Sequence, residues 1–226
     1  MSRSRPLAAV LAVSVLALSG CGVSGTGFSP GAAAQIEGTT ITVAEVDEVA
    51  AALCSVLLTS PQQSATSLSG SQLRTAAEQG LALGIVGDEL LEAYDVELPS
   101  SSDDGADNVR LSYGDADPDD LATALPAFTG GQHFNNVLLA IGTDEVGEDA
   151  DQEAIIAAGV ERAQAWQESA DLETNPLFDS FEIGDDQILS ERDDLSVAVS
   201  DDALAAVSTE DDGATGDLPE SQRCSA

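Results

Sequence analysis

The chain has 226 residues, 43% of them hydrophobic, with 41 acidic side chains against 7 basic ones and a formal net charge of −34. This length and apolar content allow one domain with a substantial core. So negative a surface repels nucleic acid and anionic lipid, so neither is expected as a partner. The basic residues are all arginine, and salt would screen the acidic self-repulsion, which suggests a halotolerant source.

Residues 1–20 have the pattern of an export signal. Arg3 and Arg5 form a positive start, and an apolar run follows that is shorter than the roughly 20 residues of a spanning helix. The run ends in Leu18-Ser19-Gly20-Cys21, which resembles the lipobox of bacterial lipoproteins. The resemblance implies cleavage before Cys21 and a diacylglycerol on that cysteine. An uncleaved membrane anchor is the alternative.

The mature chain would then stand on the extracytoplasmic face of the cell membrane, held by acyl chains and not by charge. It keeps 5 arginines against 41 acidic residues, a formal net charge of −36. Residues 21–35 are rich in Gly, Ser and Ala, which predicts a flexible tether. We expect one helical domain over residues 36–200 and an acidic tail over 201–226.

The first elements of the domain are predicted by a short strand pattern and a helix start. Gln35–Ile41 alternates like a strand with a bend at Gly38, and Thr42 and Glu45 have the spacing of a capping box. The spacing predicts a helix from Val43 to about Ser60.

A second helix is predicted from about Ser71 to Tyr94. It is apolar around most of its middle, which is typical of a buried central helix. Gly80, Gly84 and Gly87 each lower helix propensity by roughly 1 kcal/mol against Ala. Their spacing predicts that another helix packs closely against this one.

Later helices are predicted from caps and breakers. Asp117-Pro118 starts a short helix that ends by Pro126, a further helix follows Gly130-Gly131 and stops at Gly142, and a longer one spans about Asp151 to Ala170. A hairpin is expected around Gly184-Asp185-Asp186, and Leu195–Val199 alternates like an extended segment. The predicted fold is mainly α: a helical bundle around one long central helix, with a small β element formed by the N-terminal strand and the C-terminal segment.

Two cysteines remain once Cys21 carries lipid. Cys54 and Cys224 would lie in an oxidising compartment, so we predict a disulfide between them. It would tie the C-terminal tail to the first helix. Two unrelated thiols are the alternative.

The sequence contains no recognisable catalytic or cofactor motif. His133 is the only histidine and has no companions at ligand spacing, so no metal site is expected. Asp115–Asp119 begins like a calcium loop, but Asp120 stands where Gly belongs and Pro126 where Glu belongs, which favours a helix cap. With no nucleophile elbow, P-loop or dinucleotide fingerprint, we expect neither an enzyme nor a cofactor.

Four segments together resemble the SurA and PrsA chaperone domains. Ile36–Asp47 is similar to the family's opening strand and helix start, and Leu73–Val96 to its long helix and exit. Asp171–Phe178 and Leu218–Cys224 look like the D-V-x-V-N-P-R-F and L-P-x-S-Q-x-C segments of actinobacterial lipoprotein members. The resemblance implies a helical domain that binds unfolded or newly exported polypeptides. A parvulin isomerase domain, which uses paired histidines, is not expected here.

The resemblance implies an apolar cradle around the long helix, with these candidate client-binding residues: Leu83, Val86, Leu90, Tyr94 and Trp166. Trp166, Phe178 and Phe181 could line a client groove or belong to the core, and the core is favoured. The alternative function is a structural or interaction lipoprotein that binds one specific cell-envelope partner.

Overall fold

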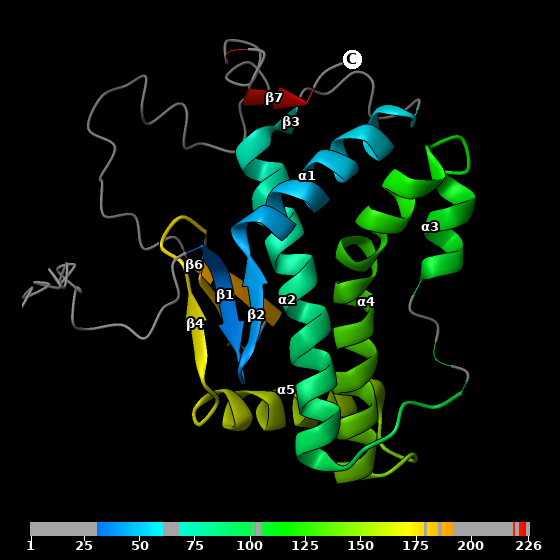
Figure 1. Cartoon of the computed structure of the whole chain (residues 1–226). Coiled ribbons are helices and arrows are strands. Elements are labelled where there is room, and N and C mark those ends of the chain that lie inside the picture. Colours follow the sequence, from blue (N-terminus) through cyan, green and yellow to red (C-terminus); the bar gives the residue numbers. More distant parts are fainter. Residues whose placement is uncertain are drawn as a thin grey trace, which may run out of the picture.

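A computed structural model describes residues 31–60, 68–100, 102, 105–178, 180–184, 187–191, 219 and 222–224. This part is mainly helical, with five helices packed together and small antiparallel sheets at their side and top (Figure 1). The predicted fold class is therefore confirmed. The export signal with Cys21 and the predicted extended segment Leu195–Val199 lie outside the described residues.

The helices are α1 Val43–Leu58, α2 Gly70–Tyr94, α3 Ala106–Ser112, α4 Pro118–Val146 and α5 Gln152–Gln167. The strands are β1 Ala32–Ile36, β2 Thr39–Thr42, β3 Leu68–Ser69, β4 Leu172–Thr174, β5 Ser180–Gly184, β6 Gln187–Glu191 and β7 Arg223–Cys224.

Strand β1 is the middle of a three-stranded antiparallel sheet in the order β2-β1-β4. Glu37 and Gly38 have positive φ (47° and 87°), which closes the β1–β2 hairpin at the bend predicted from the sequence. The predicted tether is too long, because residues 32–35 belong to β1 and Ala33 and Ala34 are fully buried. Alanine is common in linkers, but its small side chain also suits a central strand pressed against helices.

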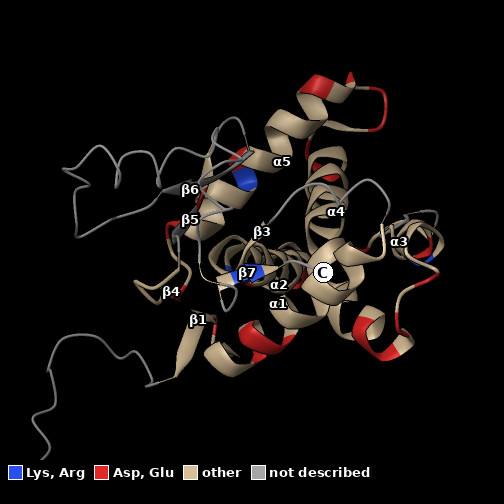
Figure 2. Cartoon of the chain, turned by 90° about the horizontal axis from the view of Figure 1, so that it is seen from above, with Lys and Arg blue, Asp and Glu red and all other residues tan. Residues whose placement is uncertain are grey.

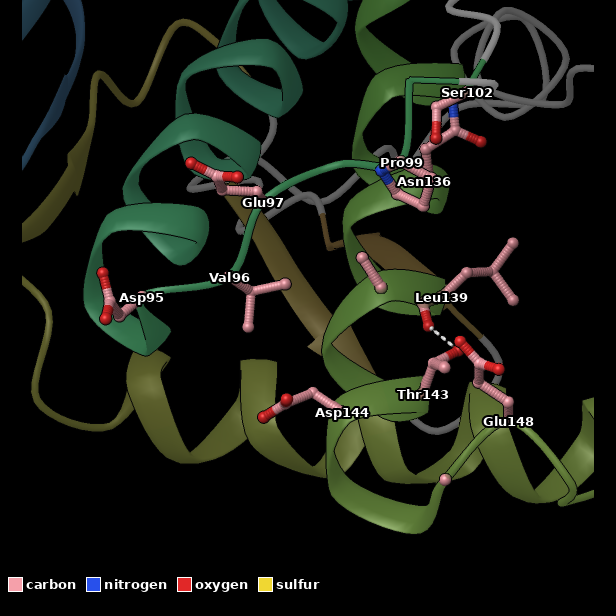
Figure 3. A pocket seen from close by; sticks show the side chains of 12 residues that line it. Asp95, Val96, Glu97, Pro99, Ser102, Asn136, Leu139, Thr143, Asp144 and Glu148 are labelled. Atoms are coloured by element: carbon pink, nitrogen blue, oxygen red, sulfur yellow. Dashed lines mark hydrogen bonds between the residues drawn. The ribbon is translucent and has the colours of Figure 1, made fainter.

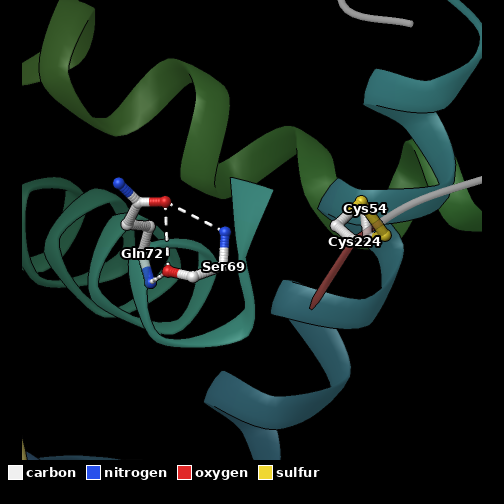
Figure 4. The surroundings of a disulfide bond; sticks show 4 residues. All are labelled: Cys54, Ser69, Gln72 and Cys224. Carbon is white, nitrogen blue, oxygen red and sulfur yellow. Dashed lines mark hydrogen bonds between the residues drawn. A yellow bond between two sulfur atoms is a disulfide. The ribbon is translucent and has the colours of Figure 1, made fainter. Parts of the chain in front are cut away.

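Side chains cap the two helices that follow. The Glu45 N–H donates to Thr42 Oγ1 (3.1 Å), so the N-cap predicted for α1 is confirmed. A full capping box starts α2: the Gln72 N–H donates to Ser69 Oγ (3.1 Å), and the Ser69 N–H donates to Gln72 Oε1 (2.9 Å) (Figure 4).

Helix α4 is one continuous helix, which corrects the prediction of two shorter ones. Asp117 caps it as expected, accepting from the N–H groups of Asp119 (2.9 Å) and Asp120 (3.3 Å). Pro126 and Gly130-Gly131 lie inside it and do not break it. Proline removes one helical hydrogen bond, and tertiary packing along the rest of α4 outweighs that cost and the low propensity of glycine.

Glycines allow α2 and α4 to run side by side with their backbones in contact (Figure 1). A Cβ on Gly130 would overlap the Gly80 carbonyl, and a Cβ on Gly80 would overlap the Ala127 carbonyl. A Cβ on Gly87 would lie 2.7 Å from His133 Cδ2. The close helix approach predicted from the α2 glycines is therefore confirmed.

A second close crossing joins α4 to α5. A Cβ on Gly142 would overlap the Ile155 carbonyl, and one on Gly159 would overlap the Leu138 carbonyl. The predicted β5–β6 hairpin is present, and the Ile183 N–H donates to Gln167 Oε1 of α5 (3.0 Å). The largest fully buried hydrophobic side chains of the shared core are Phe134, Ile36, Ile41 and Leu90.

The C-terminal segment returns to the start of the domain. Cys54 of α1 and Cys224 of β7 form the predicted disulfide, with a Cα–Cα distance of 5.6 Å (Figure 4). Strand β7 also pairs with β3 just before α2. The two connections hold the chain end against the N-terminal end of α2.

The turn after β4 is attached to both β1 and the helices. The Asn175 backbone N–H donates to the Ala33 carbonyl and its side-chain Nδ2 donates to the Ala32 carbonyl, both at 2.8 Å. Phe178 is buried, as favoured from the sequence, and the Arg74 guanidinium lies 5.5 Å from its ring centroid. The side chain of Phe181 lies outside the described residues.

Candidate functional site

The candidate site is an open groove of about 830 Å³ beside the C-terminal ends of α2 and α4 (Figure 3). Helix α2 ends at Asp95, whose left-handed backbone (φ 53°) turns the chain out of the helix. The chain then crosses α4 as residues 96–99, which belong to no helix or strand (Figure 3). The described lining residues are Asp95, Val96, Glu97, Pro99, Ser102, Asn136, Leu139, Ala140, Thr143, Asp144, Gly147 and Glu148.

Residues 95–99 have the burial pattern of a strand. Val96 and Leu98 are half-buried and pack against the core, whereas Asp95, Glu97 and Pro99 are exposed. Within the described residues, the N–H groups of Glu97 and Leu98 form no backbone hydrogen bond. Of these two residues, Glu97 also lines the groove, so its N–H is a candidate donor to a bound chain.

The groove combines an apolar floor with an acidic rim. Val96, Leu139 and Ala140 supply apolar surface, and the acidic lining residues are Asp95, Glu97, Asp144 and Glu148. The described lining contains no basic residue and no pairing of a nucleophile with a base. Such a lining can bind an extended chain or a cationic group through its carboxylates and its apolar floor.

The predicted client-binding residues do not form one open surface. Val86 and Leu90 are fully buried, which corrects their assignment, because the apolar middle of α2 is covered by α1, α4 and the sheet. Leu83 is half-buried and faces Gly131 of α4, and Trp166 is half-buried against the core.

Tyr94, the remaining predicted residue, is held by α5. Its hydroxyl donates to the Arg162 carbonyl (2.6 Å), and the Arg162 guanidinium lies 4.3 Å from its ring centroid. The same arginine is 3.6 Å from Glu145 Oε2. This contact fixes the end of α2 next to the groove.

The groove residues Val96, Glu97, Asp144 and Glu148 were missed from the sequence. The available signal was the alternation Asp95-Val96-Glu97-Leu98, which has period two directly after a helix. A second groove, of about 930 Å³, lies along α5, where Ile156 and Val160 are flanked by Glu153 and Glu161.

His133 has a packing role in the described structure. Its Nε2 lies 2.9 Å from Asp88 Oδ1, and its ring covers Gly87 at the α2–α4 contact. Among the residues that the structure describes, no group of three or more His, Cys, Asp or Glu side chains is placed to hold a metal ion.

The described surface carries many acidic residues, few basic ones and few exposed large apolar ones. Acidic residues are spread over several helices and loops, and basic residues are few (Figure 2). Over the described ranges, the exposed large hydrophobic residues are Leu111, Val146 and Leu177. None of the described helices is both long and apolar enough to cross a membrane.

Burial, together with the nearby carboxylates of Glu92, Glu37 and Asp88, raises the pKa of Glu89 on α2. Burial is the larger cause and the neighbouring carboxylates add to it, so the folded protein disfavours the charged form of Glu89.

The comparisons with known proteins found no similar protein. No protein-family model matches the chain, and no match was found among curated proteins or among solved structures.

Proposed function

We propose that this chain is an exported, lipid-anchored protein that binds unfolded or newly exported polypeptides in a chaperone-like way, without catalysis. The observation that carries the proposal is the groove beside α2 and α4, where the segment after α2 forms one edge, the Glu97 N–H has no backbone partner within the described residues, and Val96, Leu139 and Ala140 form an apolar floor. Extended polypeptides bind well to such edges, because main-chain hydrogen bonds supply affinity whatever the sequence.

The arrangement of the four SurA-like segments supports the proposal. The Ile36–Asp47 and Asp171–Phe178 segments meet at the end of the β1–β4 pair, where Ile36 lies opposite Leu172 and the Glu37 N–H donates to the Asp171 carbonyl (2.9 Å). Cys224, in the last segment, is joined to α1 by the disulfide. Segments that resemble one family thus lie together in one folded unit.

A second candidate is a lipoprotein that binds one specific cell-envelope partner. The scarcity of exposed large apolar residues in the described part favours it, since a general chaperone surface is usually a broad apolar patch. The acidic rim would then select a complementary partner.

The test uses the full chain, exported with its own leader and purified from membranes in detergent. At a tenfold molar excess it should slow the aggregation of thermally unfolding citrate synthase. Ala140→Trp, which fills the groove floor, should abolish the effect, and Ala122→Trp on an exposed part of the same helix should preserve it. No protection by the wild-type chain would refute the chaperone proposal, and one stoichiometric partner in a membrane pull-down would then favour the second candidate.

The anchor is tested separately. Cys21→Ser should release the protein from the membrane fraction and abolish its labelling by a palmitate analogue. Unchanged labelling would contradict lipidation at this residue.

A further inference from the structure

The groove has the electrostatic character of a cation site, and three independent features contribute to it. The first is the set of four carboxylates, which come from two different elements: Asp95 and Glu97 from the segment after α2, Asp144 and Glu148 from the end of α4 and the turn after it.

The second feature is the direction of the two helices. Helices α2 and α4 run the same way (Figure 1), and residues at the C-terminal ends of both line the groove. The C-terminal end of a helix carries the equivalent of about half a negative charge, and cations near it are favourable. Neither helix has a basic residue in its last turn to neutralise that charge.

The third feature is that the neighbouring arginine is already engaged elsewhere. Arg162 stacks on Tyr94 and approaches Glu145, and neither residue lines the groove. The negative potential of the groove is therefore not neutralised by the described lining.

The alternating burial of residues 95–99 indicates what kind of cationic ligand would fit the groove. Because Val96 and Leu98 face the core and Glu97 faces solvent, a strand paired with this segment would alternate in the same way. Its inward side chains would meet the apolar floor, and its outward ones would stand beside Glu97, where an opposite charge stabilises a cross-strand pair.

Resting on the proposed function, we propose that the groove binds an extended polypeptide segment in which Lys or Arg alternates with small apolar residues. The protein would thus select basic segments of exported chains and not exposed apolar segments in general. Three of the lining residues would carry this specificity: Glu97 and Glu148 on the rim and Ala140 on the floor.

The test measures fluorescence anisotropy with a fluorescein-labelled nonapeptide of alternating Lys and Val, and with the same peptide carrying Gln in place of Lys. The Lys peptide should bind at least tenfold more tightly at 50 mM salt, and the difference should shrink at 500 mM salt. Glu97→Gln with Glu148→Gln should weaken binding of the Lys peptide about three- to tenfold, since each exposed charge pair contributes modestly.

Matched variants separate the groove from the general acidity of the chain. Glu48→Gln with Glu168→Gln removes the same charge from exposed positions on α1 and at the end of α5, and should change affinity less than twofold. Ala140→Trp should block binding, and Ala122→Trp should not. Circular dichroism and an intact disulfide would verify that each variant is folded.

Each outcome has a defined meaning. Equal losses in the two double variants would overturn the proposal, because bulk charge would then explain the binding. Protection of unfolded clients with no preference for the Lys peptide would overturn the inference and leave the proposed function in place. Groove-dependent binding of the Lys peptide without protection of clients would support the inference and count against the chaperone role.

Discussion

Helices α2 and α4 run side by side, but they meet differently in their middle and beyond their ends. In the middle, Gly80 and Gly130 bring the two backbones into contact with no room for a methyl group. Beyond the ends, the chain turns away at Asp95 and leaves an open groove with an acidic rim. The comparison indicates that the middle is built for stability, and that the ends are free to carry a binding function at little cost to the fold.

The strongest test of this division removes the disulfide, which joins α1 to β7. Strand β7 lies at the N-terminal end of α2 (Figure 1), and the groove is lined by residues at the C-terminal end. Cys54→Ala with Cys224→Ala should lower the free energy of unfolding by about 4–5 kcal/mol, because the bridge closes a loop with a sequence separation of 170 residues. Urea unfolding measures the loss. Groove binding of the Lys peptide, measured at low temperature, should stay within twofold of wild type.

The wild-type chain under reducing conditions is the control, and it should unfold at the same urea concentration as the double variant. If the double variant kept its stability but lost peptide binding, the assignment of stability and binding to separate regions would be wrong.

The second prediction uses two adjacent glycines of α4. Gly130→Ala should cost about 3 kcal/mol, because the new methyl would overlap the Gly80 carbonyl and neither backbone can yield. Gly131→Ala should instead stabilise by up to about 1 kcal/mol, since its Cβ would meet only Leu83 Cδ1 at 3.9 Å and alanine favours a helix. Urea unfolding measures the change in unfolding free energy for both variants. Equal changes would contradict the described contact between α2 and α4.

The third prediction compares two apolar residues two positions apart on α4. Val137 is fully buried between the helices, and Leu139 is half-buried on the groove floor. Val137→Ala should cost about 2 kcal/mol, and Leu139→Ala less than about 1 kcal/mol although it removes more atoms. Thermal unfolding gives the order, and a larger loss at Leu139 would mean that the groove end is as much a part of the core as the middle.

The sequence predicted the packed region much better than the groove. Caps such as Thr42 and Asp117 and the pairing of Cys54 with Cys224 are local or compositional signals, so they could be recognised without coordinates. The close approach at Gly80 was also predictable, because glycines in an apolar helix are costly unless another backbone lies against them.

The errors share a physical cause, which is that tertiary packing overrides local preference. Pro126 and Gly130 carry breaker signals, yet contacts along α4 keep that helix continuous. Val86 and Leu90 are apolar enough to bind a client, but the same property buries them in the core. The groove depends on where the chain crosses α4 after Asp95, and no local pattern specifies that crossing.

The smallest predicted effect concerns Glu89, an acidic residue of α2 outside the groove lining. Its pKa is raised by burial and by the carboxylates of Glu92, Glu37 and Asp88, so the folded state disfavours its charged form. Glu89→Gln should therefore stabilise the fold slightly at pH 7, within about 0.5 kcal/mol. Because the raised pKa lets the folded state take up this proton before the unfolded state does, the advantage should shrink as the pH falls through the folded-state pKa of Glu89.

Two further measurements relate the Glu89→Gln effect to the division between the packed helices and the groove: its salt dependence and a comparison with Glu97→Gln. High salt should remove the part that comes from the neighbouring carboxylates and leave the part that comes from burial. Glu97→Gln, which neutralises an exposed rim carboxylate, should leave the unfolding free energy at pH 7 unchanged while it weakens binding of the Lys peptide. An acidic residue that affects binding and not stability is what a binding rim requires, whereas Glu89, which lies outside the groove lining, is expected to affect stability and not binding. If Glu97→Gln stabilised the fold as much as Glu89→Gln, the charge of Glu97 would act only through the general acidity of the chain. That result would contradict selective binding of cations by the groove.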